Sequence, residues 1–164
     1  MGNPHIEYID MINVKKEYIS NDRWVLNLTK LESGESRTFN QPGTNYVLIR
    51  NSEFEDENKL VKRANAAIMV ANGEFTVRCK DSDSSAVVVN YPGLRFLESR
   101  IFIQEEMDIG NLTYMDGGSN STAINPGRLG DPVINYVHFP AGMYQTLHTH
   151  PSHRIGLILK GNGR

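Results

Sequence analysis

Apolar and polar residues alternate along much of the first hundred positions of the chain. The run at 24–31 (WVLNLTKL) alternates in this way, which is typical of a strand with one buried face. Several shorter runs are rich in β-branched and aromatic residues, and turn residues separate them at roughly 8–12-residue spacing. Such spacing favours a sandwich or barrel over a parallel α/β fold. The further strands that we expect are 45–50, 67–70, 74–79 and 86–90.

This pattern predicts an all-β fold, an antiparallel double-stranded β-sandwich that spans residues 20–108. Within that span only the segment 55–67 (EDENKLVKRANAA) has a helical look, and a charged loop is the alternative there. The residues that we expect to fill the core are Trp24, Leu26, Val47, Ile49, Phe75, Val77, Val87 and Val89.

The composition changes after residue 109. Residues 110–132 are rich in Gly, Ser, Asn and Pro, which predicts a long loop or linker. Strand-like patterns then resume at 133–139, 144–150 and 154–160. The chain therefore divides into a sandwich at 1–109, a linker at 110–132 and a partial second unit at 133–164.

The last strand-like run is followed by a turn-like ending, 161–164, and by no further strand. The strands of the second unit thus carry apolar faces without the strands that would cover them. An open strand edge invites pairing with another chain. We therefore expect a homodimer, in which C-terminal strands could be exchanged. The apolar residues concerned are Val133, Tyr136, Ile155, Leu157 and Leu159.

Net charge and cysteine content limit the functional classes and the cellular locations that we expect for this protein. A formal net charge of -2 argues against a general nucleic-acid binder, which needs a basic excess. The sequence has no apolar run of the ~18 residues that span a bilayer, so we expect no membrane partner. The single cysteine, Cys79, cannot form an internal disulfide, which indicates a reducing, cytoplasmic location. Its alternating surroundings favour a half-buried strand residue over a nucleophile.

Three of the five histidines lie within six positions: His148, His150 and His153. On a strand, residues two apart point to the same face, so His148 and His150 would project side by side. Two neutral imidazoles on one face suit a divalent transition metal such as Zn, Fe, Ni or Cu. An exposed, incidental histidine cluster is the alternative.

The segment around these histidines resembles the first motif of the cupin family. Gly142, five residues, His148, one residue and His150 follow that motif, and Gly161 matches its closing glycine. The resemblance covers about 25 residues. It implies a β-sandwich of the jelly-roll kind, which encloses a small site between its sheets. It also implies a divalent metal, Fe, Mn, Ni or Zn, held by these two histidines.

The chain departs from the motif in two ways. The glutamate ligand of the motif falls at Arg154 or Ile155, and arginine cannot ligate a metal. The final histidine of the family would lie beyond Arg164. We expect His153, one position from the place of the glutamate, as a substitute ligand. Two or three ligands would hold the metal more weakly than four. The metal could therefore be absent from this 164-residue chain.

A second likeness links the two halves of the chain. The segment 34–42 aligns with 142–150 at an offset of 108 residues, and Asn40 and Pro42 then occupy the ligand positions. This suggests a two-cupin protein whose first unit is metal-free and whose second unit is incomplete. The alternative is that the opening strands of all jelly rolls look alike.

Arg154 beside a metal would be a fork for a carboxylate, although it could also be a surface arginine. Tyr136, Tyr144 and His138 could line the same pocket, or only pack. We therefore expect a small acid, such as a keto acid or sugar acid, as partner. The first functional hypothesis is a metal-dependent dioxygenase, isomerase or decarboxylase. The second is a non-catalytic cupin that binds a small ligand or assembles as a structural oligomer.

Overall fold

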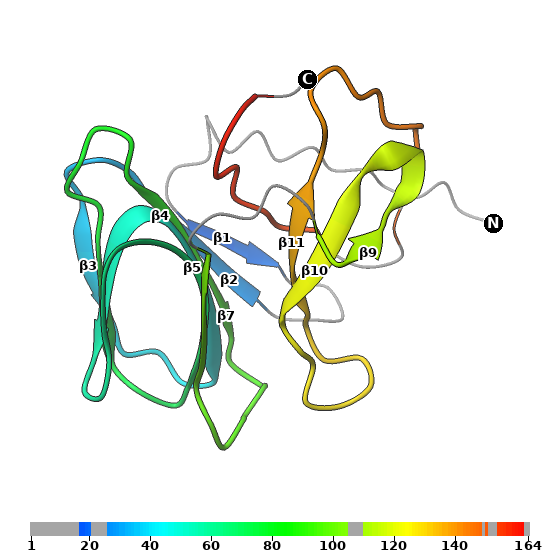
Figure 1. Ribbon diagram of the computed structural model, residues 1–164. Helices are drawn as coiled ribbons and strands as arrows, with labels where there is room; N and C mark the ends of the chain where they lie inside the picture. Colours follow the sequence, from blue (N-terminus) through cyan, green and yellow to red (C-terminus); the bar gives the residue numbers. More distant parts are fainter. Residues whose placement is uncertain (1–16, 21–25, 105–109, 149, 151–153, 163–164) are drawn as a thin grey trace.

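The computed structural model describes residues 17–20, 26–104, 110–148, 150 and 154–162. These residues form eleven strands and one short 3-10 helix, and every paired strand runs antiparallel to its neighbour (Figure 1). The prediction of an all-β antiparallel sandwich is therefore confirmed. No helix in this part of the chain is long and apolar enough to cross a membrane.

The larger sheet has eight strands. Six of them follow the order β1-β2-β7-β4-β5-β8, while β6 pairs with both β3 and β4. The bounds are β1 (Glu17–Ser20), β2 (Leu26–Leu31), β3 (Ser36–Phe39), β4 (Thr44–Asp56), β5 (Leu60–Ala71), β6 (Phe75–Arg78), β7 (Ser85–Tyr91) and β8 (Arg100–Gln104).

The long strand β4 turns this sheet back on itself. Its first half pairs with β7, and its second half, beyond a β-bulge near Ser52, pairs with β6. Bulges bend a strand and increase its twist, so β6 and β3 close over the opposite strands (Figure 1). The enclosed core is built around three stacked rings: the ring centroid of Phe75 lies 5.0 Å from that of Phe39 and 5.5 Å from that of Phe54.

A smaller sheet covers the outer face of the larger one. It has the order β11-β10-β9, with bounds β9 (Leu112–Thr113), β10 (Ser119–Ile124) and β11 (Ile134–His138), and the 3-10 helix η1 (Met115–Gly117) precedes β10. A second apolar cluster fills the space between the sheets. It joins strand residues of the larger sheet to residues from the C-terminal third. The former include Leu26, Leu28, Tyr46, Met69, Val87 and Val89, and the latter include Ile124, Ile134, Ile155 and Leu157.

Seven of the eight residues expected in the core are buried; the eighth, Trp24, lies outside the described residues. Cys79 was expected half-buried on a strand, and this is wrong in two respects. It follows β6 directly and is 0% exposed. Burial raises the pKa of its thiol. A buried thiol with a raised pKa is a poor nucleophile, so the structural role predicted for Cys79 stands.

The segment 55–67 is neither a helix nor a loop. It forms the tip of the β4–β5 hairpin and the first part of β5. The tip is held by the Asp56 carboxylate, which accepts hydrogen bonds from the backbone N–H groups of Asn58 at 2.9 Å and Lys59 at 2.6 Å. An aspartate that bonds its own backbone in this way favours a turn over a helix.

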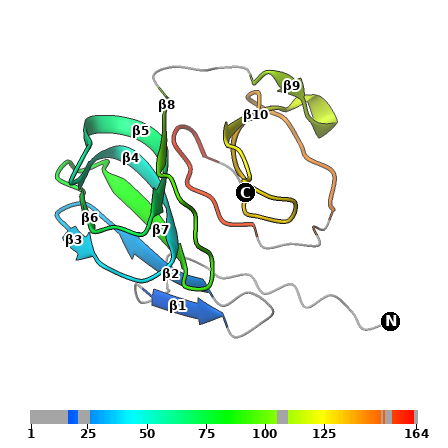
Figure 2. The same ribbon diagram turned by 90° about the horizontal axis from the view of Figure 1, so that it is seen from below.

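Two predictions for the C-terminal third are wrong. The segment 110–132 is not a structureless linker, because it contains β9, η1 and β10. Conversely, the described residues of 144–150 and 154–160 form no strand. Burial alternates along 154–160, and Arg50 Nη1 donates to the Ile158 carbonyl at 2.9 Å. The segment therefore lies against the larger sheet with one apolar edge inward, without joining a ladder (Figure 2).

Candidate metal centre

The structure brings His148 and His150 together. Their Nε2 atoms lie 3.1 Å apart, and their rings meet edge to face with centroids 4.8 Å apart. Two imidazole nitrogens that each lie about 2.0–2.1 Å from one Zn²⁺ are themselves roughly 3 Å apart. The pair thus has the separation of two ligands on one metal ion, although the residues are not on a strand as expected.

The hydrogen-bond partners of the two rings determine which nitrogen of each ring carries the proton. His148 Nδ1 lies 2.7 Å from the Thr146 carbonyl, which can only accept, so Nδ1 donates and Nε2 keeps its lone pair. Arg154 Nη2 lies 3.1 Å from His150 Nδ1, and a guanidinium can only donate. A neutral His150 therefore carries its proton on Nε2 and donates it to His148 Nε2.

His150 is held in the neutral form by its surroundings. Its pKa is lowered by loss of solvation first, then by the positive charge of Arg154 and by His148. Neutral imidazole is the form that binds metals. Arg154 thus favours the neutral ring, yet its hydrogen bond occupies Nδ1 and keeps the proton on the nitrogen that faces His148.

A carboxylate from another part of the chain holds this segment in place. Asp116 accepts from the Thr146 backbone N–H at 2.8 Å and from the Thr146 hydroxyl at 3.0 Å. Asp116 belongs to η1 and has a left-handed φ of 56°. Because Thr146 in turn accepts from His148, the contacts form a line from Asp116 through Thr146 to the histidines. Sequence reasoning missed Asp116, which lies in the segment taken for a linker.

The remaining predicted site residues are placed apart from the pair or outside the described residues. His153 is outside them. Tyr144 is 87% exposed, and His138 is half-buried on β11. Within the described chain neither residue has a hydrogen bond or ring contact with the pair. Of the predicted site residues, the structure thus groups His148, His150 and Arg154.

The donor set fits a metal only in part. Two imidazole nitrogens are suitably placed, but no group of three or more His, Cys, Asp or Glu that could hold a metal occurs among the described residues. His150 is exposed at the surface, so water or a ligand can reach the open side of the pair. Any further ligands would come from solvent, a bound acid or residues outside those described.

Comparisons with known proteins add no relative. No protein-family model matches the chain, and neither a curated protein nor a solved structure matches it.

We expect Asp116 to act as a positioning residue for the histidine pair. In Asp116→Ala the anchor of Thr146 is lost, and the affinity for Zn²⁺ should fall by about tenfold, the lower end for residues that orient a ligand. Asp116→Asn keeps one acceptor oxygen and should restore most of the affinity. Isothermal titration measures both. Glu57→Ala, which removes an exposed carboxylate from the β4–β5 turn, is the control; equal affinity in Asp116→Ala and the control contradicts the role.

Proposed function

We propose that the chain is a cupin-type sandwich that binds one divalent transition metal, Fe, Mn, Ni or Zn, through His148 and His150. The observation that carries the proposal is the 3.1 Å separation of their Nε2 atoms. The spacing of Gly142, His148, His150 and Gly161 supports it, as does the antiparallel all-β fold. The activity we infer is that of a metal-dependent dioxygenase, isomerase or decarboxylase.

The proposed substrate is a small acid, and Arg154 is the residue proposed to recognise it. Its guanidinium is 3.1 Å from His150 Nδ1, so a carboxylate bound by Arg154 would lie beside the metal position. A guanidinium binds a carboxylate through two parallel hydrogen bonds, which also orients the substrate. The metal, when bound, supplies Lewis-acid or oxygen-activating chemistry.

A second candidate function is a cupin that binds a small ligand or assembles as an oligomer without catalysis. The observation that favours it is the short donor set, with an arginine in place of the motif's glutamate. Metal binding separates the two candidates. Isothermal titration of Zn²⁺ or Ni²⁺ into the chain should give one site if the first proposal holds, and no saturable heat if the second does.

The same titration has an expected pH dependence. Protons compete with the metal for imidazole nitrogens, so affinity should fall as pH drops through ~6.5, the ordinary histidine value. The lowered pKa of His150 means that its ring stays neutral to a lower pH, so its part of the loss occurs further down. Affinity that is constant between about pH 7 and pH 5 would exclude histidine ligands.

We expect Arg154 to compete with the metal. Its hydrogen bond to His150 keeps the Nε2 atom protonated, and a metal needs that nitrogen free. Arg154→Met should therefore raise the affinity for Zn²⁺, by about tenfold if one charge-assisted hydrogen bond is released. The same variant should bind malonate less well when loaded with metal. Lys160→Met, an exposed change of equal charge, is the control for the titration; weaker Zn²⁺ binding in Arg154→Met than in Lys160→Met contradicts the competition.

We also propose that two copies of the chain associate through the small sheet. In the described chain β11 has one unpaired edge, and apolar side chains lie exposed on and after it: Val137 at 41%, Phe139 at 47% and Leu147 at 89%. An exposed apolar edge strand is a site for pairing with a second copy. Light scattering should give the mass of a dimer, and Val137→Lys should give a monomer. A wild-type monomer at high concentration would contradict the proposal.

A further inference from the structure

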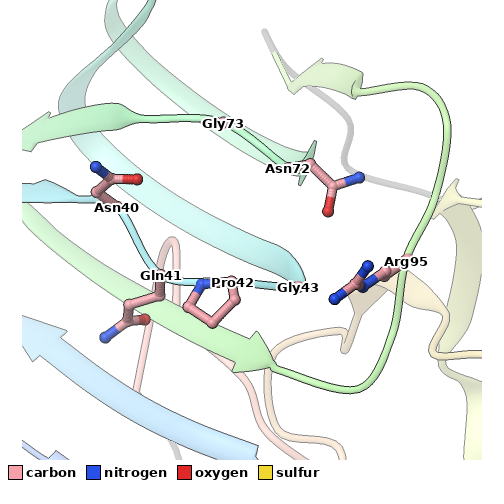
Figure 3. Close-up of a pocket in the computed structure, with 7 residues that line it drawn as sticks. All are labelled: Asn40, Gln41, Pro42, Gly43, Asn72, Gly73 and Arg95. Carbon is pink, nitrogen blue, oxygen red and sulfur yellow. The ribbon is translucent and has the colours of Figure 1, made fainter.

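A cavity of about 450 Å³, wide open to solvent, lies where three loops of the larger sheet meet (Figure 3), and neither histidine of the pair lines it. The loops are those between β3 and β4, between β5 and β6, and between β7 and β8. Its volume is within the range of about 300–1,000 Å³ that is typical of small-molecule sites. The residues that line it are Asn40, Gln41, Pro42, Gly43, Asn72, Gly73 and Arg95.

The backbone around the cavity is held in place by close contacts. Gly43 has a φ of +93°, and a Cβ there would lie 2.2 Å from the Tyr91 carbonyl oxygen, so the β3–β4 loop rests directly on the end of β7. Opposite it, Asn72 adopts a left-handed φ of 55° and donates through Nδ2 to the Phe96 carbonyl at 2.9 Å. The two walls are thus tied to the β7–β8 connection, which carries Arg95.

The electrostatics of the lining favour a negative ligand. Arg95 is the charged residue of the lining, and no carboxylate is part of it. Among the described residues Arg95 has no ion pair or hydrogen bond, and Figure 3 shows its guanidinium and the Asn72 amide pointing toward one another across one end of the cavity. An unpaired guanidinium in a concave site is a fork for carboxylate or phosphate oxygens.

A buried amide system adjoins one wall. Asn90 Nδ2 donates to the Pro42 carbonyl and to Asn45 Oδ1, each at 3.0 Å. Asn45 is 0% exposed, and its Nδ2 has no acceptor in the described part of the chain. Buried donors normally have partners, and the wall behind Pro42 therefore offers an N–H group that no carboxylate of the described chain neutralises.

We propose that this cavity binds a small molecule through an anionic carboxylate or phosphate group held by Arg95. The site shares no residue with the proposed metal centre, so anion binding here does not require that His148 and His150 bind a metal.

The test is a titration of the isotope-labelled chain, monitored by the backbone amide resonances of Gly43, Asn72, Gly73 and Arg95. Malonate and inorganic phosphate are the probes, and malonamide is the uncharged match for malonate. We expect saturable shifts of these resonances with a dissociation constant on the order of 1 mM, and none with malonamide. A response to malonate alone indicates a carboxylate ligand, and a response to phosphate alone a phosphate ester.

Two variants complete the test. Arg95→Gln should weaken binding by at least about tenfold, the value of one lost charge-assisted hydrogen bond. Arg78→Gln alters an arginine that is paired with Glu55 at 2.7 Å and changes the net charge equally, so it should bind like the wild type. His148→Ala should also leave the shifts unchanged. The inference is overturned if neither anion gives saturable shifts, if malonamide acts like malonate, or if Arg95→Gln and Arg78→Gln bind equally.

Discussion

His148→Ala should abolish saturable Zn²⁺ binding, a loss of at least about 100-fold or about 2.7 kcal/mol. The Nε2 atom of His148 is the unprotonated nitrogen of its ring, since its Nδ1 donates to Thr146, and a metal would replace the His150 N–H that it accepts. Without it His150 would be a single imidazole that already faces Arg154. Isothermal titration at pH 7.5 or above measures the loss, because protons then compete little with the metal.

The matched control is His138→Ala, which removes another half-buried histidine from a different segment, β11. It should titrate like the wild type. If His148→Ala binds Zn²⁺ as tightly as His138→Ala does, the metal proposal fails. The non-catalytic candidate would then be preferred.

Phe75→Ala should destabilise the chain by about 3–5 kcal/mol. Phe75 is 1% exposed and is stacked between the rings of Phe39 and Phe54, so its removal leaves a cavity at the centre of the closed core. Domains of this size are stable by only about 5–15 kcal/mol, so the variant should unfold at a much lower urea concentration. Circular dichroism as a function of urea gives the difference.

Leu97→Ala is the control for this loss. Leu97 is fully exposed, at 102%, and its truncation should change stability by no more than about 0.5 kcal/mol. Phe75→Leu keeps much of the apolar volume and should fall between the two. A loss below about 1.5 kcal/mol for Phe75→Ala would mean that the core collapses around the missing ring, and that the stack is not its centre.

The strands of the larger sheet were predictable because their side chains alternate between two environments. In β6, for example, Phe75 and Val77 are buried in the closed core, while Thr76 and Arg78 are half-buried. The sequence itself shows this alternation of apolar and polar residues. The turn at the tip of the β4–β5 hairpin was not predictable, because 55–67 is rich in charged residues. The hydrogen bonds that the Asp56 carboxylate accepts show that the chain turns there.

The small sheet was missed for a different reason. Composition marked 110–132 as a loop, yet Ser119 and Ser121 are buried in β10, and their hydroxyls accept from the backbone N–H groups of Gly110 at 2.7 Å and Asn111 at 2.8 Å. Small polar residues can therefore fill a close strand contact that propensity does not reveal. Gly110 itself is required there, since a Cβ would meet the Asn120 backbone at 2.4 Å.

The candidate site was predictable in three members, His148, His150 and Arg154, and not in its geometry. Histidines two apart suggested a shared strand face, whereas the described residues of 144–150 form no strand, and the rings nevertheless meet. Asp116 lies 30 residues from Thr146, and no local spacing announces such a contact. The alternating pattern of 154–160 indicates that one face of the segment is apolar. Such a face can pack against the sheet without backbone pairing to a neighbouring strand.

In the described part of the chain, residues 154–160 pair with no strand, which should affect how fast their amide hydrogens exchange with solvent. Amides in β4 and β7 are held by ladders on both sides and should exchange hydrogen only when the whole domain opens. The segment 154–160 is tied to the larger sheet by the hydrogen bond from Arg50 to the Ile158 carbonyl and joins no ladder, so it should open locally at far lower cost. Because Arg154 begins this segment, an acid bound by its guanidinium adds its binding free energy to the segment's local stability. Binding of the acid would thus be recorded as slowed exchange at Ile155 and Leu157.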